Sequence, residues 1–204
     1  VVVLNTGGPV AMPWLGRVAA VLEMWLPGDA QGPAAAAMLF GDREPGGRLP
    51  VTFPRDETQG PATQRRQFPG IPDPVTGALD TAYFEEGHFI GYRYLDQYGQ
   101  APSFPFGHGL GYASFRIDDA LVKPDRAGGA IVRARVRNVS GRAGSEVVQV
   151  YVGLPEAAGA PPRQLAGFAR VALKPDELDV HRVQVLARLG QELSQEIVHD
   201  DRGL

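Results

Sequence analysis

The hydrophobic pattern at the start of the chain is that of alternating strands and helices. Val1–Leu4 and Val21–Leu26 are short, continuous apolar runs, which are typical of buried strands. Gly32–Phe40 contains four consecutive alanines behind a proline, a composition that favours an α-helix. A shorter helix is expected over Trp14–Ala20, between the two strands. The order strand, helix, strand, helix predicts parallel βα units covered by helices.

A different pattern fills the second half of the chain. In Ile131–Arg137, small apolar residues alternate with arginines, and such alternation predicts a half-buried antiparallel strand. Further strands are expected over Glu146–Val152 and Gln164–Leu173, and Asn138–Gly141 has the composition of a turn. Several short strands separated by turn signals predict a β-sandwich.

The segment between these two patterns, Arg55–Pro102, is rich in Pro, Gly, Gln, Arg and Asp and shows little periodicity. Its length predicts a surface excursion that has a function or packs on another part of the protein. Tyr92–Asp96 and Phe104–Tyr112 hold so many aromatic, Gly and Pro residues that we expect a shaped connector and no regular element. Three large side chains of the connector are expected to seal the joint between the flanking parts: Phe104, Phe106 and Tyr112.

Composition narrows the class of protein. The 204 residues are 44% hydrophobic, which suffices for one large core or two small ones. A net charge of −3 gives no electrostatic reason to expect a nucleic-acid or membrane partner, and no apolar run is long enough to span a bilayer. The absence of cysteine excludes disulfides and thiolate chemistry but leaves the cellular compartment open.

Four motifs together resemble a known enzyme family, and their shared order and spacing are more specific than any one motif. They lie at Gly46–Pro54, Tyr92–Asp96, Phe104–Tyr112 and Arg142–Tyr151. A chain with these motifs is similar to the C-terminal part of a glycoside hydrolase of family 3, of the β-glucosidase type. The resemblance extends over residues 1–185. It indicates a fragment, because members of this family have a large barrel domain and part of a second domain before the matching region.

The resemblance implies an α/β plus all-β fold in three parts. Residues 1–54 correspond to the end of an α/β sandwich with a parallel sheet, residues 55–113 to a long excursion and interdomain connector, and residues 114–204 to a fibronectin type III-like β-sandwich. This sandwich is expected to be incomplete at its C-terminus, because the tail Arg188–Glu196 does not match the family's last strands. Truncation or a reading-frame change near residue 186 would explain the tail, whose composition favours a helix.

The activity implied for the parent protein is retaining hydrolysis of terminal, non-reducing β-linked glucose or xylose, in carbohydrate metabolism and without a cofactor. This reaction needs two carboxyl groups. The family takes an Asp nucleophile from its barrel and a Glu acid/base from a loop before the match to Val1. No catalytic, cofactor-binding or metal-binding residue is therefore assigned in this chain, and the fragment is expected to be a non-catalytic scaffold. Its implied partners are the missing N-terminal barrel and, in the parent protein, an oligosaccharide or β-glucoside substrate, while a homodimer stays open.

Several residues of chemical interest have a structural interpretation that we prefer. Glu85 and Glu86 are adjacent, so that on an extended segment they point to opposite sides and are poorly placed to act as a pair. A role in holding Arg93, or in a backbone turn, is favoured. Asn5–Pro9 lacks the spacing of a phosphate loop and is interpreted as a tight turn. The histidines have no spacing typical of a metal site: they are His88, His108, His181 and His199.

Other features leave alternatives open. His108 is interpreted as a residue of the interdomain joint. Asn138–Ser140 has the form of an N-glycosylation acceptor, but the Ala, Arg, Gly and Pro bias is typical of a bacterial protein, so a turn is preferred. A periplasmic or secreted location is favoured over a cytoplasmic one. The alternative function is a stand-alone carbohydrate-binding or protein-interaction module, with Trp14, Trp25 and exposed tyrosines as sugar platforms, although both tryptophans lie beside apolar stretches that favour core packing.

Overall fold

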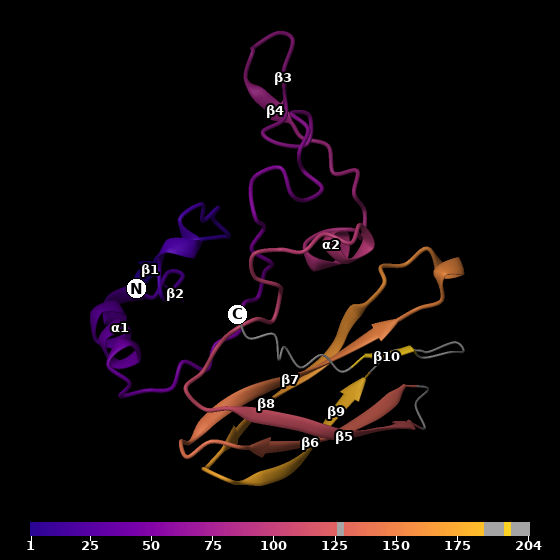
Figure 1. The fold of residues 1–204 in the computed structure, drawn as a ribbon. Coiled ribbons are helices and arrows are strands. Elements are labelled where there is room, and N and C mark those ends of the chain that lie inside the picture. Colours follow the sequence, from indigo (N-terminus) through magenta and orange to yellow (C-terminus); the bar gives the residue numbers. More distant parts are fainter. Residues whose placement is uncertain (126–128, 186–193, 197–204) are drawn as a thin grey trace.

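The computed structural model describes residues 1–125, 129–185 and 194–196, and three parts follow one another along the chain (Figure 1). An α/β part at the N-terminus is followed by an excursion that stands away from the rest, at the top of the view. Two β-sheets make up the remainder. No helix among the described residues is long and apolar enough to cross a membrane.

The α/β part contains the predicted alternation of strands and helices. β1 (Val2–Leu4) and β2 (Val21–Glu23) form a parallel pair, and α1 (Gln31–Leu39) follows them. These elements and their parallel pairing confirm the sequence-based expectation. The helix predicted between the strands is reduced to a single 3₁₀ turn, η1 (Leu15–Arg17), because glycine and β-branched valine are poor helix formers. A second 3₁₀ turn, η2 (Gly28–Ala30), leads into α1.

The strands of the α/β part are less buried than their apolar sequence predicts. Val3 in β1 is 38% exposed, and Leu26 and Phe40, which follow β2 and α1, are 80% and 83% exposed. Parallel strands are normally buried on both faces under helices. Among the described residues, however, β1 pairs only with β2. The prediction of a buried first strand is therefore wrong for this chain on its own.

The excursion is a long and largely exposed segment, as predicted, and it contains a small hairpin. β3 (Ile71–Pro72) and β4 (Leu79–Thr81) pair in antiparallel orientation. Asp73 stabilises the turn between them, because its Oδ1 atom accepts hydrogen bonds from the backbone N–H groups of Val75 (2.8 Å) and Thr76 (2.6 Å). Such a side-chain to backbone bond is a common reason for aspartate in turns.

The prediction that Tyr92–Asp96 forms no regular element is wrong, because the segment lies in the short helix α2 (Tyr92–Gln97). Six residues are too few to form a stable helix by propensity alone. Residues four apart share one helix face. Tyr92 contacts the start of the strand β8 (Gln164–Leu173) at Leu165, and Asp96 contacts Arg163 just before this strand. Tertiary contacts therefore hold this helix in place.

The remainder of the chain forms two three-stranded antiparallel sheets, with the orders β5-β6-β9 and β10-β7-β8. Besides β8, the strands are β5 (Phe115–Pro124), β6 (Ala130–Asn138), β7 (Gly144–Gly153), β9 (Leu178–Val185) and β10 (Ser194–Glu196). The 3₁₀ turn η3 (Glu156–Ala158) lies between β7 and β8. The structure confirms the three predicted strands as β6, β7 and β8. The sequence pattern predicts neither β5 nor β9.

The core of the two sheets follows the predicted alternation. Val136 of β6 is fully buried, and Val148 of β7 and Val171 of β8 pack with it in one cluster, each 1% exposed. A second cluster joins Val132 of β6 to Val150 of β7 and further apolar residues. Both clusters draw on the two sheets, which therefore pack face to face. The arginines of β6 lie on the opposite face, as the pattern predicts.

The tail departs from its predicted conformation where it is described. Ser194–Glu196 is the strand β10, paired in antiparallel orientation with β7. The helix favoured by composition is therefore wrong for these three residues, because pairing with an available sheet edge overrides a weak local preference. The rest of that predicted segment, residues 188–193, lies outside the described residues.

Asn138 fixes the turn between β6 and β7 and is fully buried. Its Nδ2 atom donates to the carbonyl oxygens of Arg142 (2.7 Å) and Leu173 (3.3 Å), and its Oδ1 atom accepts from the backbone N–H (3.0 Å) and the hydroxyl (2.7 Å) of Ser140. The turn interpretation of Asn138–Ser140 is confirmed. The amide nitrogen that glycosylation would modify is engaged inside the domain.

Replacing this asparagine should destabilise the β-sheet part. Asn138→Ala removes the hydrogen bonds to the carbonyl groups of Arg142 and Leu173 and to the Ser140 N–H, although the Arg142 carbonyl still accepts the Ser140 hydroxyl. We expect a loss of about 2–4 kcal/mol in the free energy of unfolding, because a buried group left unpaired costs roughly 1–3 kcal/mol. Denaturant-induced unfolding measures this loss. Val139→Ala is the matched control, because Val139 is half exposed beside the same turn and its change should cost little. Equal losses for both variants would contradict the role given to Asn138.

Candidate functional site

Two of the sequence motifs pair with each other at the joint between the three parts. The backbone N–H of Phe53 donates to the carbonyl of Phe104 (2.9 Å), and the N–H of Leu49 donates to the carbonyl of His108 (2.8 Å). The Gly107 N–H returns a bond to the Leu49 carbonyl (2.8 Å). Phe53 is 2% exposed, so this pairing has a buried aromatic anchor.

A third motif, on β7, contacts this pair through ionic and close backbone contacts. Arg48 donates from Nε (3.1 Å) and a terminal nitrogen (2.8 Å) to Oε1 of Glu146, and both side chains are nearly buried. Oε1 of Glu44 accepts the backbone N–H groups of Tyr112 (2.9 Å) and Ala113 (3.0 Å). These contacts attach the end of the α/β part to both the connector and the sheets.

The fourth motif lies in α2 and contacts β7, β8 and the residue just before β8. The backbone N–H of Leu165 donates to the hydroxyl of Tyr92 (2.8 Å). The ring of Tyr92 stacks on Phe106 at a centroid distance of 5.0 Å and meets Tyr151 edge-on at 5.9 Å. Asp96 accepts two bonds from Arg163, one from Nε (2.7 Å) and one from a terminal nitrogen (3.1 Å). All four motifs thus meet at one joint.

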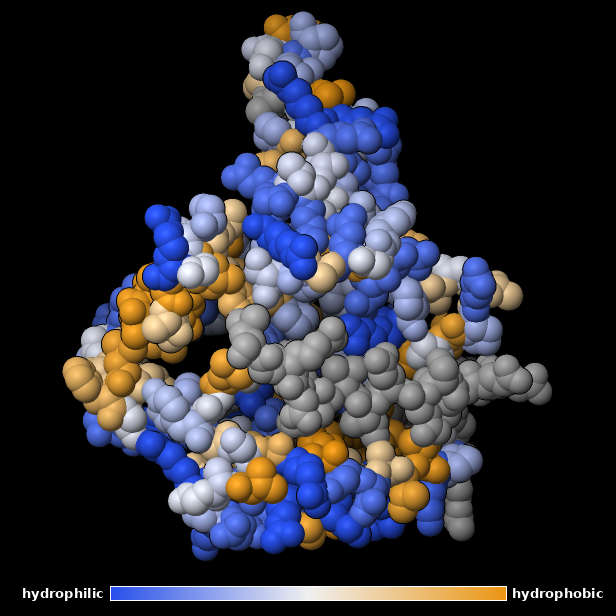
Figure 2. Space-filling model, viewed as in Figure 1, coloured by the Kyte–Doolittle hydropathy of each residue, from blue (hydrophilic) through white to orange (hydrophobic). Residues whose placement is uncertain are grey.

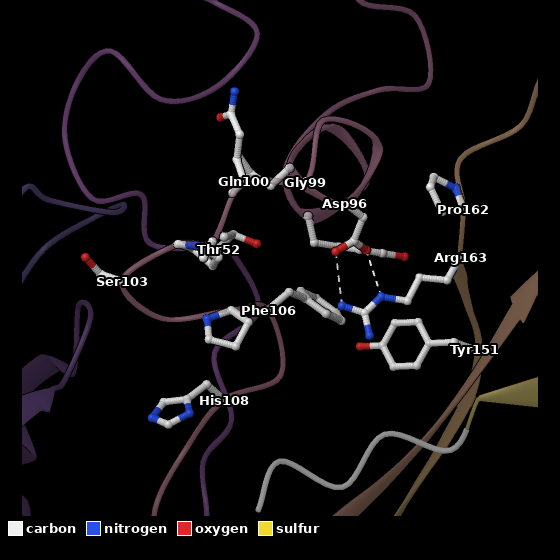
Figure 3. A pocket seen from close by; sticks show the side chains of 15 residues that line it. Thr52, Asp96, Gly99, Gln100, Ser103, Phe106, His108, Tyr151, Pro162 and Arg163 are labelled. Carbon is white, nitrogen blue, oxygen red and sulfur yellow. Dashed lines mark hydrogen bonds and ion pairs between the residues drawn. The ribbon is translucent and has the colours of Figure 1, made fainter. Parts of the chain in front are cut away.

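A pocket of about 580 Å³ opens between α2, the connector, the strand β7 and the two residues just before β8 (Figure 3). The Asp96–Arg163 pair forms part of its lining, and the Tyr151 ring lies under the Arg163 guanidinium at 5.2 Å. Thr52 and Ser103 also line the pocket. The Thr52 Oγ1 atom is buried and has no hydrogen-bond partner among the described residues. The pocket thus has polar and aromatic walls, and its charged residues Asp96 and Arg163 are paired with each other.

Tyr151 has a raised pKa because of its place in this wall. Burial is the main cause, the neighbouring Tyr92 adds to it, and together they raise the pKa of Tyr151 to about 12, with Arg163 acting in the opposite direction. The hydroxyl therefore stays protonated at neutral pH. It donates to Oε1 of Gln149 (2.6 Å) within β7.

The raised pKa predicts a loss of stability in alkaline solution. The folded state holds the Tyr151 proton more tightly than the unfolded state, whose pKa is about 10. The resulting stabilisation is complete below pH 10 and disappears as the pH rises from about 10 to about 12. Unfolding free energies measured across this range should fall more steeply for the unmodified chain than for Tyr151→Phe. Parallel curves for the two proteins would contradict the assignment.

The acidic residues singled out in the excursion have structural contacts. Glu85 forms an ion pair with Arg66 (2.6 Å), and both side chains are substantially exposed. The expectation that a carboxylate holds Arg93 is wrong for Glu85, because its carboxylate pairs with Arg66 instead. Glu86 takes part in a backbone turn, its carbonyl accepting the N–H of Phe89 (3.0 Å), which agrees with the alternative interpretation.

The loop after β1 is a turn, as predicted. The Thr6 hydroxyl lies 2.8 Å from the Gly8 carbonyl and 3.0 Å from Oε2 of Glu23, while Oε1 of Glu23 accepts the N–H of Trp25 (2.7 Å). The Trp25 ring packs against Phe53 at 6.0 Å, which supports core packing over a sugar platform. These contacts connect the ends of both parallel strands to the joint.

The histidines singled out in the sequence do not form a metal site within the described residues. His108 lies at the joint, as predicted, with its ring 5.1 Å from that of Phe104. No group of three potential metal ligands occurs within the described residues, and His199 lies outside them.

Phe104 and Phe106 are only partly buried, and Tyr112 is 45% exposed. The buried anchor of the joint is Phe53 instead.

Comparison with known proteins agrees with this arrangement. Residues 1–112 match the glycosyl hydrolase family 3 C-terminal domain, and residues 146–189 match a fibronectin type III-like domain. The fold and the joint are those of the C-terminal portion of a glycoside hydrolase. The chain belongs to glycosyl hydrolase family 3, which confirms the resemblance carried by the four motifs.

The relatives are enzymes much longer than the matching region. A β-glucosidase of Rhizobium radiobacter is 45% identical over 178 residues, which cover 86% of this chain and 21% of the relative. An exo-α-(1→6)-L-arabinopyranosidase of Bifidobacterium breve is 40% identical, covering 87% of this chain and 22% of that protein. Among solved structures, a β-glucosidase of Streptomyces venezuelae in complex with D-glucose superimposes with a TM-score of 0.81 at 39% identity, covering 90% of this chain and 23% of that one. The chain thus spans about a fifth of its relatives' length.

Proposed function

We propose that this chain is the C-terminal part of a retaining glycoside hydrolase that releases terminal, non-reducing β-D-glucosyl or β-D-xylosyl residues. Relatives named β-glucosidases support the substrate class. Within that enzyme the chain acts as a non-catalytic scaffold, divided at residues 1–54, 55–113 and 114–204. The catalytic Asp and Glu of the parent enzyme come from the barrel and from a loop of the α/β sandwich, both outside this chain.

The joint is the observation that carries the scaffold role. A retaining hydrolase needs two carboxyl groups about 5–5.5 Å apart on either side of the bond that is cleaved. The acidic residues of the joint are instead engaged in holding the parts together: Glu146 pairs with Arg48, Asp96 pairs with Arg163, and Glu44 caps backbone N–H groups. These acidic residues therefore have structural roles, and the family motifs lie around them.

The α/β part is proposed to dock onto the rest of the parent enzyme. Hydrophobic surface gathers over this part, on the left of the view in Figure 2. It includes four strongly exposed apolar side chains, Val1, Leu26, Leu39 and Phe40. A parallel sheet normally continues on its edges and is covered on both faces. The remaining strands and helices of the α/β sandwich are the partner that fits this surface.

A chimeric enzyme tests the proposal. Residues 1–185 of this chain would replace the matching segment of the Rhizobium radiobacter relative, and hydrolysis of an aryl β-glucoside and an aryl β-xyloside would be measured. We expect turnover, with the β-anomer of the sugar appearing first in the NMR spectrum, because retention passes through a covalent glycosyl intermediate.

Two controls make the result decisive. The unmodified relative shows that the assay works, and the same relative without the segment shows that the segment is needed. A folded chimera that cleaves neither substrate would overturn the proposed parent activity, and initial release of the α-anomer would overturn the retaining mechanism.

A further inference from the structure

The outer face of the sheet β5-β6-β9 gathers positive charge. This sheet lies at the bottom of the view in Figure 1, whereas the contacts of the joint run through β7 and β8. The register places Arg137 opposite Arg116 of β5, and Arg133 opposite Arg182 of β9. The alternate residues of β6 enter the core, so these arginines point away from it. With two further side chains, the face carries six cations: Arg116, Lys123, Arg133, Arg135, Arg137 and Arg182.

Only two of these cations have a carboxylate partner among the described residues. Arg116 pairs with Asp118 at 2.6 Å, and Arg135 pairs with Asp119. Six cations and two carboxylates give the face a net charge of +4, on a chain whose net charge is −3. Four cations are thus available to bind an anion.

The arrangement of the arginines is unfavourable for the chain alone. Like charges directly opposite each other destabilise a sheet. Arg133 lies opposite Arg182, and neither forms an ion pair with another described residue. A face that met only water would be more stable with an acid at one of these positions. An anion bound at this pair turns the repulsion into two attractive contacts.

The type and spacing of the cations indicate a linear polymer as the partner. Five of the six are arginines, whose planar guanidinium binds carboxylate or phosphate groups through two parallel hydrogen bonds. Arg133 and Arg137 lie four residues apart in β6, which separates their Cα atoms by about 13–14 Å. One small anion cannot reach both ends of this row. A chain molecule with repeated acidic groups can.

Aliphatic side chains between the arginines indicate sugar rings. Val180 lies opposite Arg135 and is 52% exposed, and Leu178 lies opposite Arg137 and is 47% exposed. Both are shorter than an arginine and end below the guanidinium groups. They are therefore poorly placed to enter a membrane whose headgroups the arginines contact. They can pack on the carbon–hydrogen surface of a sugar ring that lies flat on the sheet.

Nucleic acid fits this face less well. Proteins that bind single strands stack the bases on aromatic side chains. The outward positions of the paired, described residues of β5, β6 and β9 hold no aromatic residue. A three-stranded sheet is also wider than the two-stranded ribbon that the major groove of DNA admits.

We propose that the outer face of β5-β6-β9 binds a linear acidic polysaccharide built of uronic acids. Its carboxylates pair with Arg182 and Arg137, and its ring faces lie on Val180 and Leu178. Arg133 is only partly exposed and its Nε atom is buried, so it acts through its charge. The inference does not rest on the parent activity proposed above. The face would attach the protein to an acidic glycan without cleaving it.

Titration of the full chain with oligogalacturonate at low ionic strength tests the site, followed by the backbone NMR signals. We expect saturable changes in β6 and β9, which disappear at about 1 M NaCl because the Debye length falls to about 3 Å. The methyl ester of the same oligomer keeps the sugar backbone but loses the charge, so it should not bind. D-Galacturonate alone should bind much more weakly, since it cannot span the row.

Two arginine variants locate the binding surface. Arg182→Gln and Arg137→Gln should each weaken binding roughly two- to five-fold, the usual scale of one exposed ion pair. Arg65→Gln is the matched control, because Arg65 is exposed in the excursion and its loss changes the net charge equally. Arg182→Gln should leave the unfolding midpoint of the free chain unchanged or higher, since it removes a like charge opposite Arg133. A lower midpoint would contradict the cost assigned to this pair.

Three results would overturn the proposal: equal binding of the oligogalacturonate and its methyl ester, equal affinity of Arg182→Gln and Arg65→Gln, or signal changes confined to other parts of the chain. Tighter binding of a DNA duplex or of phosphatidylglycerol vesicles under the same conditions would assign the face to that partner and reject the polysaccharide.

Discussion

The purified chain is expected to leave aryl β-glucosides and aryl β-xylosides intact. General acid catalysis alone contributes about 10² to 10⁴-fold to such reactions, and loss of the nucleophile removes the covalent route as well. We therefore expect a rate at least about 10⁴-fold below that of a full-length relative in the same assay. Release of the aryl alcohol, measured by absorbance, provides the comparison. The intact relative and the chimera serve as positive controls.

Variants of two glutamates in the excursion provide the most informative control for that assay. Glu85 and Glu86 are the only adjacent carboxylates among aromatic residues in this segment, and Glu85 already pairs with Arg66. Any turnover by the isolated chain that disappears in Glu85→Gln or Glu86→Gln would mean that these residues catalyse. It would then be necessary to abandon the scaffold role.

Removal of the Phe53 ring is expected to cost about 3–5 kcal/mol of unfolding free energy, as is usual for large-to-small changes at packed aromatic sites. Phe53 is 2% exposed, packs against Trp25 and pairs through its backbone with Phe104. Phe53→Ala would thus leave a cavity where the α/β part meets the connector. Phe106→Ala should cost less, because the Phe106 ring is only partly buried.

Denaturant-induced unfolding of both variants measures this difference. Phe40→Ala provides the matched control, because Phe40 is 83% exposed and surface changes are usually within about 0.5 kcal/mol. If Phe53→Ala behaved like Phe40→Ala, the joint would be solvated and would not act as a packed core.

Strict alternation explains which strands the sequence predicts. In β6, every second residue enters the core, so the period of two is plain. In β5, the register shifts between Asp118 and Leu121, and this irregularity breaks the period. In β9, Val180 is 52% exposed whereas Val183 is 4% exposed, so apolar residues occur on both faces. A pattern search based on a single apolar face therefore finds neither of these strands.

The pocket at the joint depends on contacts that no local pattern contains. The spacing of Tyr92 and Asp96 is a signal for one helix face, yet six residues with two tyrosines give no propensity argument for a helix. Thr52 and Arg163 are far apart in the sequence, yet both line the pocket in the folded chain. The family motifs identify the joint from sequence, whereas its pocket and its ion pairs require the tertiary structure.

The close backbone packing at the joint has a consequence for protein engineering. Gly107, at a φ of +83°, lies so near the Gln149 side chain that a Cβ atom would collide with it, and a Cβ on Gly144 would lie 2.5 Å from that of Ala113. The connector and β7 are consequently in close contact along this seam. Recombination between relatives that exchanges only residues 114–185 would separate residues that pack closely on one another across this seam. Crossovers should instead fall before residue 44, so that all residues of the seam come from the same parent protein.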